Sequence, residues 1–341
     1  MVTKFLGKSL LLIVVVGILQ FLVFAPFHRL DPLKKFEACV AQQPKVIYFC
    51  DSCNAWIDID DVDRRLITEL LNDQLLDKEV VRLDGGAYHL ELYEAFVDLL
   101  ITRQVRPDVL IIPVNLRSFS AEWDARPAYS FSSAKQQLRR ADNPVASAFS
   151  PLMKTLQWER EETPSIADFR ATAVFDGEQQ VGTVTDFDNN AYLHPTPELV
   201  RNKFIFHYMS SLQPQHRKLV ALRNIAHQAA KHNLKILFYV TPIDYQTGTA
   251  CLGERFTQQV SKNIALIRRN VSEYPVDFVD WSFALDASAF SWNTYPNEHL
   301  KEKGRSFVAR NLAARLADQY AFELKNTPTH IAKQEAENNM R

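Results

Sequence analysis

The chain contains a serine and a histidine at positions that suit nucleophilic catalysis. Ser52 follows an acid, Asp51, directly after the apolar run at 46–49. His299 lies far away in the sequence, just before the last helical pattern. A serine hydroxyl is a weak nucleophile until a base takes its proton, and an imidazole commonly supplies that base. The two residues therefore predict a serine hydrolase or acyltransferase, provided that the fold brings them together.

Two further polar positions could stabilise the negative charge that develops when an ester is attacked. Gly86, with Gly85 before it, follows the apolar run at 80–83, and Asn115 follows the run at 108–114. A donor aimed at the developing oxyanion can contribute about 3 kcal/mol. We expect the Gly86 N–H, the Asn115 amide and the Ser52 N–H to form this oxyanion hole. A glycine suits such a place because the backbone must approach the substrate closely.

Each of these residues also has a structural alternative. Ser52 could cap a turn, Gly86 could supply a positive φ, and Asn115 could be a strand-end turn residue. His299 could simply pack against the last helix, and His89, three residues after Gly86, is its strongest rival as the base.

The elements that must position these residues alternate along the chain. Apolar runs predict strands at 46–49, 80–83, 108–114, 235–241 and 276–280, and helical spacing predicts helices between them and after the last. This alternation predicts an α/β fold with a parallel sheet and helices on both faces. The carboxyl ends of its strands would then form one ligand-binding edge.

Two regions depart from this simple alternation. Residues 117–212 are interpreted as an insertion that caps the site, with a hairpin around Asp176 and Gly177. An acidic stretch at 58–63 is expected to open a helix carrying Val62 and Leu66, where acids complement the helix dipole. A calcium loop is the alternative, but the glycine and terminal glutamate of an EF-hand are missing.

Taken in order, these motifs resemble the SGNH/GDSL hydrolase superfamily, over about residues 45–316 without the insertion. The likeness is closest to membrane-anchored members that modify cell-surface polymers, such as alginate-acetylation and teichoic-acid D-alanylation proteins. It implies a flavodoxin-like three-layer α/β/α sandwich and a Ser–His esterase or O-acyltransferase acting on acyl esters of an envelope glycan. It implies no metal or organic cofactor. Cys50 replaces the glycine of the serine motif, and Asn115 lacks its usual flanking Gly and Asp.

The third member of the implied triad is missing from its usual place. The family has an aspartate three residues before the histidine, where this chain has Pro296. Asp286 could replace it, whereas Glu298 is expected to point elsewhere. We favour a dyad in which a backbone carbonyl orients His299, with a histidine pKa near or somewhat above 6.5. The missing acid also leaves open a catalytically inactive binding or scaffold subunit of an envelope polysaccharide assembly.

The four cysteines include a C-x-x-C pair, Cys50 and Cys53. A redox pair or half of a zinc site would have this spacing. No second C-x-x-C or nearby histidine pair supports zinc, and a strand runs directly into the pair. We therefore expect small buried residues beside a tight turn.

Composition and the N-terminal segment set the expected location. The formal net charge of −1 over 341 residues gives no electrostatic reason to expect nucleic-acid binding. Residues 5–27 are long and apolar enough to predict a membrane anchor, with a cleaved signal peptide as the alternative. We expect an anchor at 1–28, a linker at 29–44, the catalytic domain at 45–320 and a flexible tail at 321–341. The domain is expected outside the cytoplasm, on the inner membrane, with a membrane partner that could supply acyl groups.

Overall fold

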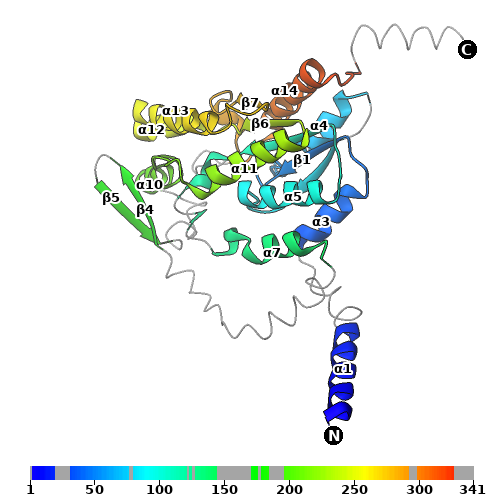
Figure 1. Cartoon of the computed structure of the whole chain (residues 1–341). Coiled ribbons are helices and arrows are strands. Elements are labelled where there is room, and N and C mark those ends of the chain that lie inside the picture. The colour runs from blue at the N-terminus through cyan, green and yellow to red at the C-terminus, as the bar shows by residue number, and fades with distance from the viewer. Residues whose placement is uncertain are drawn as a thin grey trace, which may run out of the picture.

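The fold is built on one parallel sheet with helices on both faces (Figure 1), and the computed structural model describes residues 2–19, 31–76, 80–120, 123–124, 127–143, 170–175, 178–183, 196–291 and 298–325. The sheet has five strands in the order β2-β1-β3-β6-β7, and all neighbouring strands are parallel. The predicted α/β class and parallel sheet are confirmed. The strands are β1 (Val46–Cys50), β2 (Val80–Asp84), β3 (Val109–Val114), β6 (Ile236–Val240) and β7 (Asp277–Asp280).

The central strands are apolar throughout because both of their faces are covered. Every residue of β1, β3 and β6 is buried, as expected for an inner strand of a parallel sheet. The outer strands β2 and β7 are only partly buried. The register aligns Cys50 with Asp84 and Val114 with Val240, so the carboxyl ends of the strands meet at one edge.

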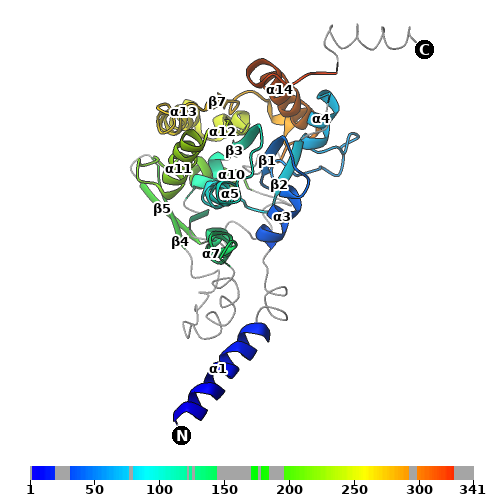
Figure 2. The same ribbon diagram turned by 45° about the vertical axis from the view of Figure 1, so that its right-hand side comes forward.

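Two groups of helices cover the two faces (Figure 2). Phe49 of β1 packs with Phe96 of α5 on one face, whose core also takes residues from α3, α10, α11 and α13. Tyr48, the next residue back, points to the opposite face and lies in the core formed with α4 and α14. These helices are α3 (Asp31–Val40), α4 (Ile67–Gln74), α5 (Leu90–Thr102), α10 (Pro197–Tyr208), α11 (Arg217–His232), α13 (Glu254–Arg269) and α14 (Glu302–Tyr320).

The helix expected to begin in the acidic stretch begins later. Residues 58–66 form turns and a loop, and α4 begins at Ile67. Val62, expected in the core, is 91% exposed. The carboxylate of Asp61 bonds to the first turn of α14 instead, because Oδ1 accepts from the Glu302 N–H at 3.0 Å. The acid therefore complements the dipole of the last helix.

The segment expected to be a linker at 29–44 contains a helix that belongs to the core. In α3, Leu33, Phe36 and Cys39 are buried. The Phe36 ring stacks on that of Phe96, with centroids 6.0 Å apart. A helix with one buried face packs as part of the domain, so the folded unit includes residues from Asp31 onward.

The expected insertion contains several elements of its own. They are η2 (Leu116–Phe119), η3 (Pro127–Ser130), α7 (Ser132–Arg140) and an antiparallel pair, β4 (Arg170–Phe175) with β5 (Glu178–Thr183), before α10. The pair confirms the expected hairpin, whose turn at 176–177 lies outside the described residues. Two short elements later in the chain, α12 (Tyr245–Leu252) and η5 (Ala287–Ala289), precede the site segment before α14.

The N-terminal segment forms α1 (Val2–Leu19), which stands apart from the domain in both views (Figures 1 and 2). Nine of its large apolar side chains, including Phe5 and Leu10, are between 43% and 72% exposed. In the part of the chain that the structure describes, no helix has the length and apolarity needed to cross a membrane.

Candidate functional site

The turn after β1 is shaped by the carboxylate of Asp51. Its Oδ1 accepts from the Cys53 N–H at 2.9 Å and from the Asn54 amide at 3.0 Å. An aspartate that bonds two residues ahead in this way closes an Asx turn. The turn holds Ser52 between two buried neighbours, while Ser52 itself is half-buried.

Asn115 joins the end of β3 to this turn. Its Nδ2 donates to Oδ2 of Asp51 at 2.7 Å and to Sγ of Cys53 at 3.3 Å, and its Oδ1 accepts from the Arg117 N–H. The expected meeting of the β1 and β3 ends is therefore present. Both amide hydrogens of Asn115 are engaged here, so a substrate oxygen would have to displace one of these contacts.

Glu298 brings the segment before α14 into the same cluster. This buried carboxylate accepts from the Tyr208 hydroxyl at 2.7 Å and from Sγ of Cys53 at 3.6 Å. Nε of Arg117 lies 3.2 Å from its Oε2. Glu298 was expected to point away from the site, and it points inward because Tyr208 and Arg117 satisfy its charge there.

Two buried carboxylates therefore share one guanidinium. Burial raises the pKa of Asp51 and of Glu298, and the charge of Arg117 opposes both shifts. One positive charge cannot compensate two buried negative ones fully, so both pKa values remain above the usual carboxylate value.

His299 lies beside this cluster as a neutral base. Its ring meets the Trp56 ring edge-on, with centroids 5.2 Å apart. Burial, and secondarily the charge of Arg117, lower the pKa of His299 to about 3. The expected pKa near or somewhat above 6.5 is not found, because burial of the ring, and secondarily the charge of Arg117, disfavour the imidazolium.

Asp286, the candidate third member, faces the start of α14 from outside. Its Oδ2 accepts from Nζ of Lys303 at 2.6 Å and its Oδ1 from the Ser288 N–H at 2.9 Å. The Lys303 ammonium, with help from Ser288, lowers the pKa of Asp286 to about 2. The carboxylate nearest to His299 in sequence, Glu298, is the one that enters the buried cluster.

The two glycines after β2, Gly85 and Gly86, differ in how much space a side chain would have. An added Cβ at Gly85 would lie 2.2 Å from the Tyr88 ring, whereas one at Gly86 would meet nothing within 4 Å. The positive φ that Gly86 could have supplied occurs at Ala87 instead, with φ 59°. Gly86 therefore borders open space, which leaves its role as an oxyanion donor a prediction.

His89, the rival base, is a structural residue. Its Nδ1 accepts from the Glu91 N–H and caps α5, while its Nε2 lies 2.5 Å from the Tyr129 carbonyl. Both ring nitrogens are thus engaged. Burial, with the nearby charge of Lys218, lowers the pKa of His89 to about 4.

The C-x-x-C cysteines lie buried on either side of the turn, as expected. All four thiols are free. Sγ of Cys50 donates to the Tyr48 carbonyl at 3.6 Å, whereas Sγ of Cys53 faces Glu298. Burial raises the pKa of both thiols well above its usual value. Buried thiols with raised pKa values are poor redox nucleophiles.

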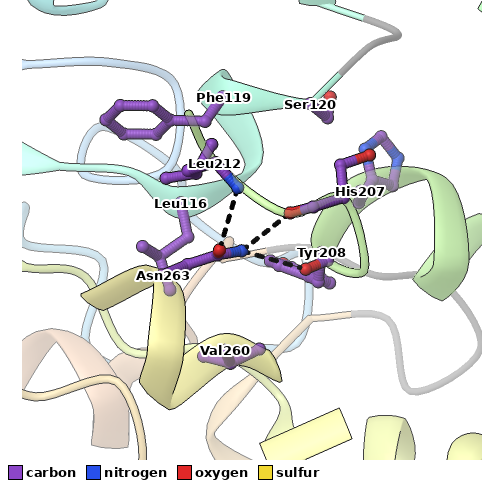
Figure 3. Close-up of a pocket in the computed structure, with 9 residues that line it drawn as sticks. Leu116, Phe119, Ser120, His207, Tyr208, Leu212, Val260 and Asn263 are labelled. Carbon is purple, nitrogen blue, oxygen red and sulfur yellow. Dashed lines mark hydrogen bonds between the residues drawn. The ribbon is translucent and has the colours of Figure 1, made fainter. Parts of the chain in front are cut away.

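A small cavity lies behind Tyr208 (Figure 3). Asn263 fixes its wall by bonding to the Leu212 N–H and the Ser210 carbonyl. The cavity has a volume of about 20 Å³, which holds about one water molecule. It is therefore too small for an ester substrate. A larger depression of about 390 Å³ lies beside Arg268 and Asp280 and contains no expected site residue.

Sequence reasoning missed Arg117 and Tyr208. Arg117 lies two residues after Asn115, so the end of β3 offered a signal for it. Tyr208 ends α10 in the insertion, where the sequence shows no motif. No protein-family model matches the chain, and no curated protein matches it in sequence.

Proposed function

We propose that this protein is a serine esterase or O-acyltransferase of SGNH type that acts on acyl esters of a cell-envelope glycan. Ser52 is the nucleophile and His299 the base, and the Gly86 N–H and the Asn115 amide donate to the oxyanion. The strand order corresponds to the flavodoxin-like order 2-1-3-4-5, which supports a three-layer SGNH-type sandwich with residues 117–212 as an inserted cap. No cofactor is part of the proposal.

The observation that carries this proposal is the convergence of the Ser52 turn with the His299 segment. Cys53, next to Ser52, touches Glu298, next to His299, at 3.6 Å. Trp56, four residues after Ser52, contacts the His299 ring. These contacts join the end of β1 to a segment about 245 residues away at the ligand-binding edge of the sheet.

The proposed setting is the outer face of the inner membrane. The exposed apolar side chains of α1 support a lipid-facing role for the N-terminal segment. A membrane partner that delivers acyl groups would then act at the same surface, and nucleic acid is not among the proposed partners.

A serine-directed fluorophosphonate probe tests the nucleophile. We expect the wild-type protein to be labelled on Ser52 and Ser52→Ala to stay unlabelled, since removing the hydroxyl removes the attacking atom. The fold should survive, with a stability loss of about 1 kcal/mol or less. Labelling is measured by in-gel fluorescence and peptide mass spectrometry.

Ser272→Ala is the matched control, because Ser272 is an exposed serine whose hydroxyl donates to the nearby Arg269 carbonyl. It should be labelled as fast as the wild type. Equal labelling of Ser52→Ala would eliminate Ser52 as the nucleophile.

A second candidate is a catalytically inactive SGNH-like binding or scaffold subunit of an envelope polysaccharide assembly. The full engagement of the Asn115 amide by Asp51 and Cys53 favours it, because a working oxyanion hole needs donors that face the substrate. A folded wild-type protein that the probe ignores would support this candidate.

A further inference from the structure

The guanidinium of Arg305, in the first turn of α14, is completely buried. It donates to Oδ2 of Asp61 at 2.6 Å and to the Leu300 carbonyl at 3.0 Å. Its other acceptors are backbone carbonyls in the loop that follows Ser52, namely those of Arg65 at 2.9 Å, Trp56 at 3.4 Å and Asp63. One side chain therefore ties that loop to the residue after His299.

Asp61 completes the connection from the loop side. Its Oδ2 also accepts from the Asp58 N–H at 2.7 Å, and its Oδ1 caps α14 at Glu302. Glu302 makes a second contact between α14 and the loop, because its carboxylate accepts from the Asp63 N–H at 2.7 Å. The loop and the start of α14 are thus bonded in both directions.

We infer that Arg305 and Asp61 are positioning residues that hold the His299 segment against the Ser52 loop. The inference rests on the proposed function, and it concerns the alignment of the proposed base and nucleophile. Trp56, whose carbonyl Arg305 binds, places its ring against His299, and Leu300, whose carbonyl Arg305 also binds, follows His299 directly.

The buried Arg305–Asp61 ion pair is better explained by the alignment of the site segments than by a contribution to the stability of the fold. Burying two charges costs about as much free energy as their attraction returns, so apolar residues can often replace such a pair without loss. A buried pair does specify one arrangement of the groups around it. Here that arrangement joins the two halves of the proposed site.

The test compares ion pairs at the two ends of one helix. Arg305→Lys keeps the charge but loses the planar fork, and Asp61→Asn removes the charge while keeping an acceptor for the Glu302 N–H. We expect each to slow fluorophosphonate labelling of Ser52 about 10²-fold, since misplacement of about 1 Å can have that effect. If Arg305→Lys does not fold, as judged by circular dichroism, Asp61→Asn carries the test.

Arg315→Gln is the control variant. It removes the ion pair of Arg315 with Asp277, at 2.5 Å, which ties the same helix to β7 away from the site. This variant should be labelled at the wild-type rate. Equal slowing in Arg315→Gln and Arg305→Lys would overturn the inference, because both would then act by loosening α14.

A second readout does not depend on catalysis. The ring current of Trp56 should displace the His299 ring-proton resonances in the wild-type NMR spectrum. Arg305→Lys should move them toward the values of a free histidine, and Arg315→Gln should leave them in place. If the wild-type protein is never labelled, the proposed function fails and this shift alone decides the inference. Unchanged resonances in Arg305→Lys would overturn it.

Discussion

At the scale of single residues, the site is defined by which groups carry charge beside His299. Arg117 faces Glu298 directly and lies close enough to His299 to disfavour a second positive charge. Lysines and arginines next to an imidazole lower its pKa, whereas a carboxylate would raise it. Burial of the ring is the larger cause of the low pKa of His299 and the charge of Arg117 the smaller one. The imidazole is therefore neutral over the whole physiological range, which a general base requires, but it is a weak base.

The pH dependence of Ser52 labelling follows from this low pKa. A base is active above its pKa, so a histidine with a pKa of about 3 should give a rate that changes less than about twofold between pH 5 and 8. An unperturbed histidine would instead make the rate at pH 5 about 30-fold lower than its maximum. Labelling rates of the full-length protein across this range distinguish the two.

Asp286→Asn is the companion variant. Because Lys303 and Ser288 hold the Asp286 carboxylate, removing its charge should leave the rate and its pH profile unchanged. A large loss of rate in Asp286→Asn would restore a carboxylate-assisted triad, whereas an inflection near pH 6.5 in the wild type would mean that His299 has an unperturbed pKa.

At the scale of elements, the site depends on loops that helices hold from outside the sheet. The end of β1 is fixed by Asn115 from β3, and the segment before α14 is fixed by an isolated bridge between Leu300 and Phe290. On the face of the sheet opposite α14, α3 packs next to β2 through Phe36 and Leu33. The folded unit therefore begins at α3 and not at β1.

Truncation tests this boundary. Deleting residues 1–30 should yield a soluble, monodisperse protein that unfolds within a few degrees of the full chain, since α1 does not pack on the domain. Deleting residues 1–44 also removes Phe36, and losing one buried phenylalanine typically costs about 3–5 kcal/mol. This longer deletion should unfold or aggregate, as measured by gel filtration and thermal denaturation. Equal stability of the two truncated proteins would mean that α3 is a linker and not part of the folded unit.

At the scale of the whole molecule, burial keeps two histidines neutral in the folded state. His89 caps α5 and His299 lies at the site, and burial is the main cause of the low pKa of each. In the unfolded chain their pKa is about 6.5. Below that pH the unfolded chain takes up protons that the folded chain does not, so the stability these groups contribute is lost as the pH falls.

Chemical denaturation at two pH values measures this effect. Between pH 7 and pH 5 each histidine should cost about 2 kcal/mol of unfolding free energy. His89→Asn keeps a helix-capping acceptor but cannot be protonated, so it should lose about 2 kcal/mol less than the wild type over this interval. The two proteins should show the same pH dependence between pH 7 and 9. Identical losses between pH 7 and 5 would mean that His89 is already protonated in the folded state.

The strands could be predicted from the sequence because inner strands of a parallel sheet are continuous apolar runs. The runs at 46–49 and 108–114 became β1 and β3 with shifts of one residue, and a helix expected between the runs at 235–241 and 276–280 is α13. The helix expected at Val62 failed because its acids bond to another helix, which local spacing cannot show. The helix α3 was missed because its burial depends on a distant partner, Phe96.

By itself, the sequence determined which residues stand at the ends of strands, because strand periodicity and strand-end polarity are local properties of the chain. It thereby placed Asp51, Ser52 and Asn115 at one edge of a parallel sheet. Only the tertiary structure decided that Glu298 turns inward, that Asp286 pairs with Lys303, and that a cation lies near His299. Side-chain partners and pKa values depend on groups from other parts of the chain, and no local pattern records which of them will meet.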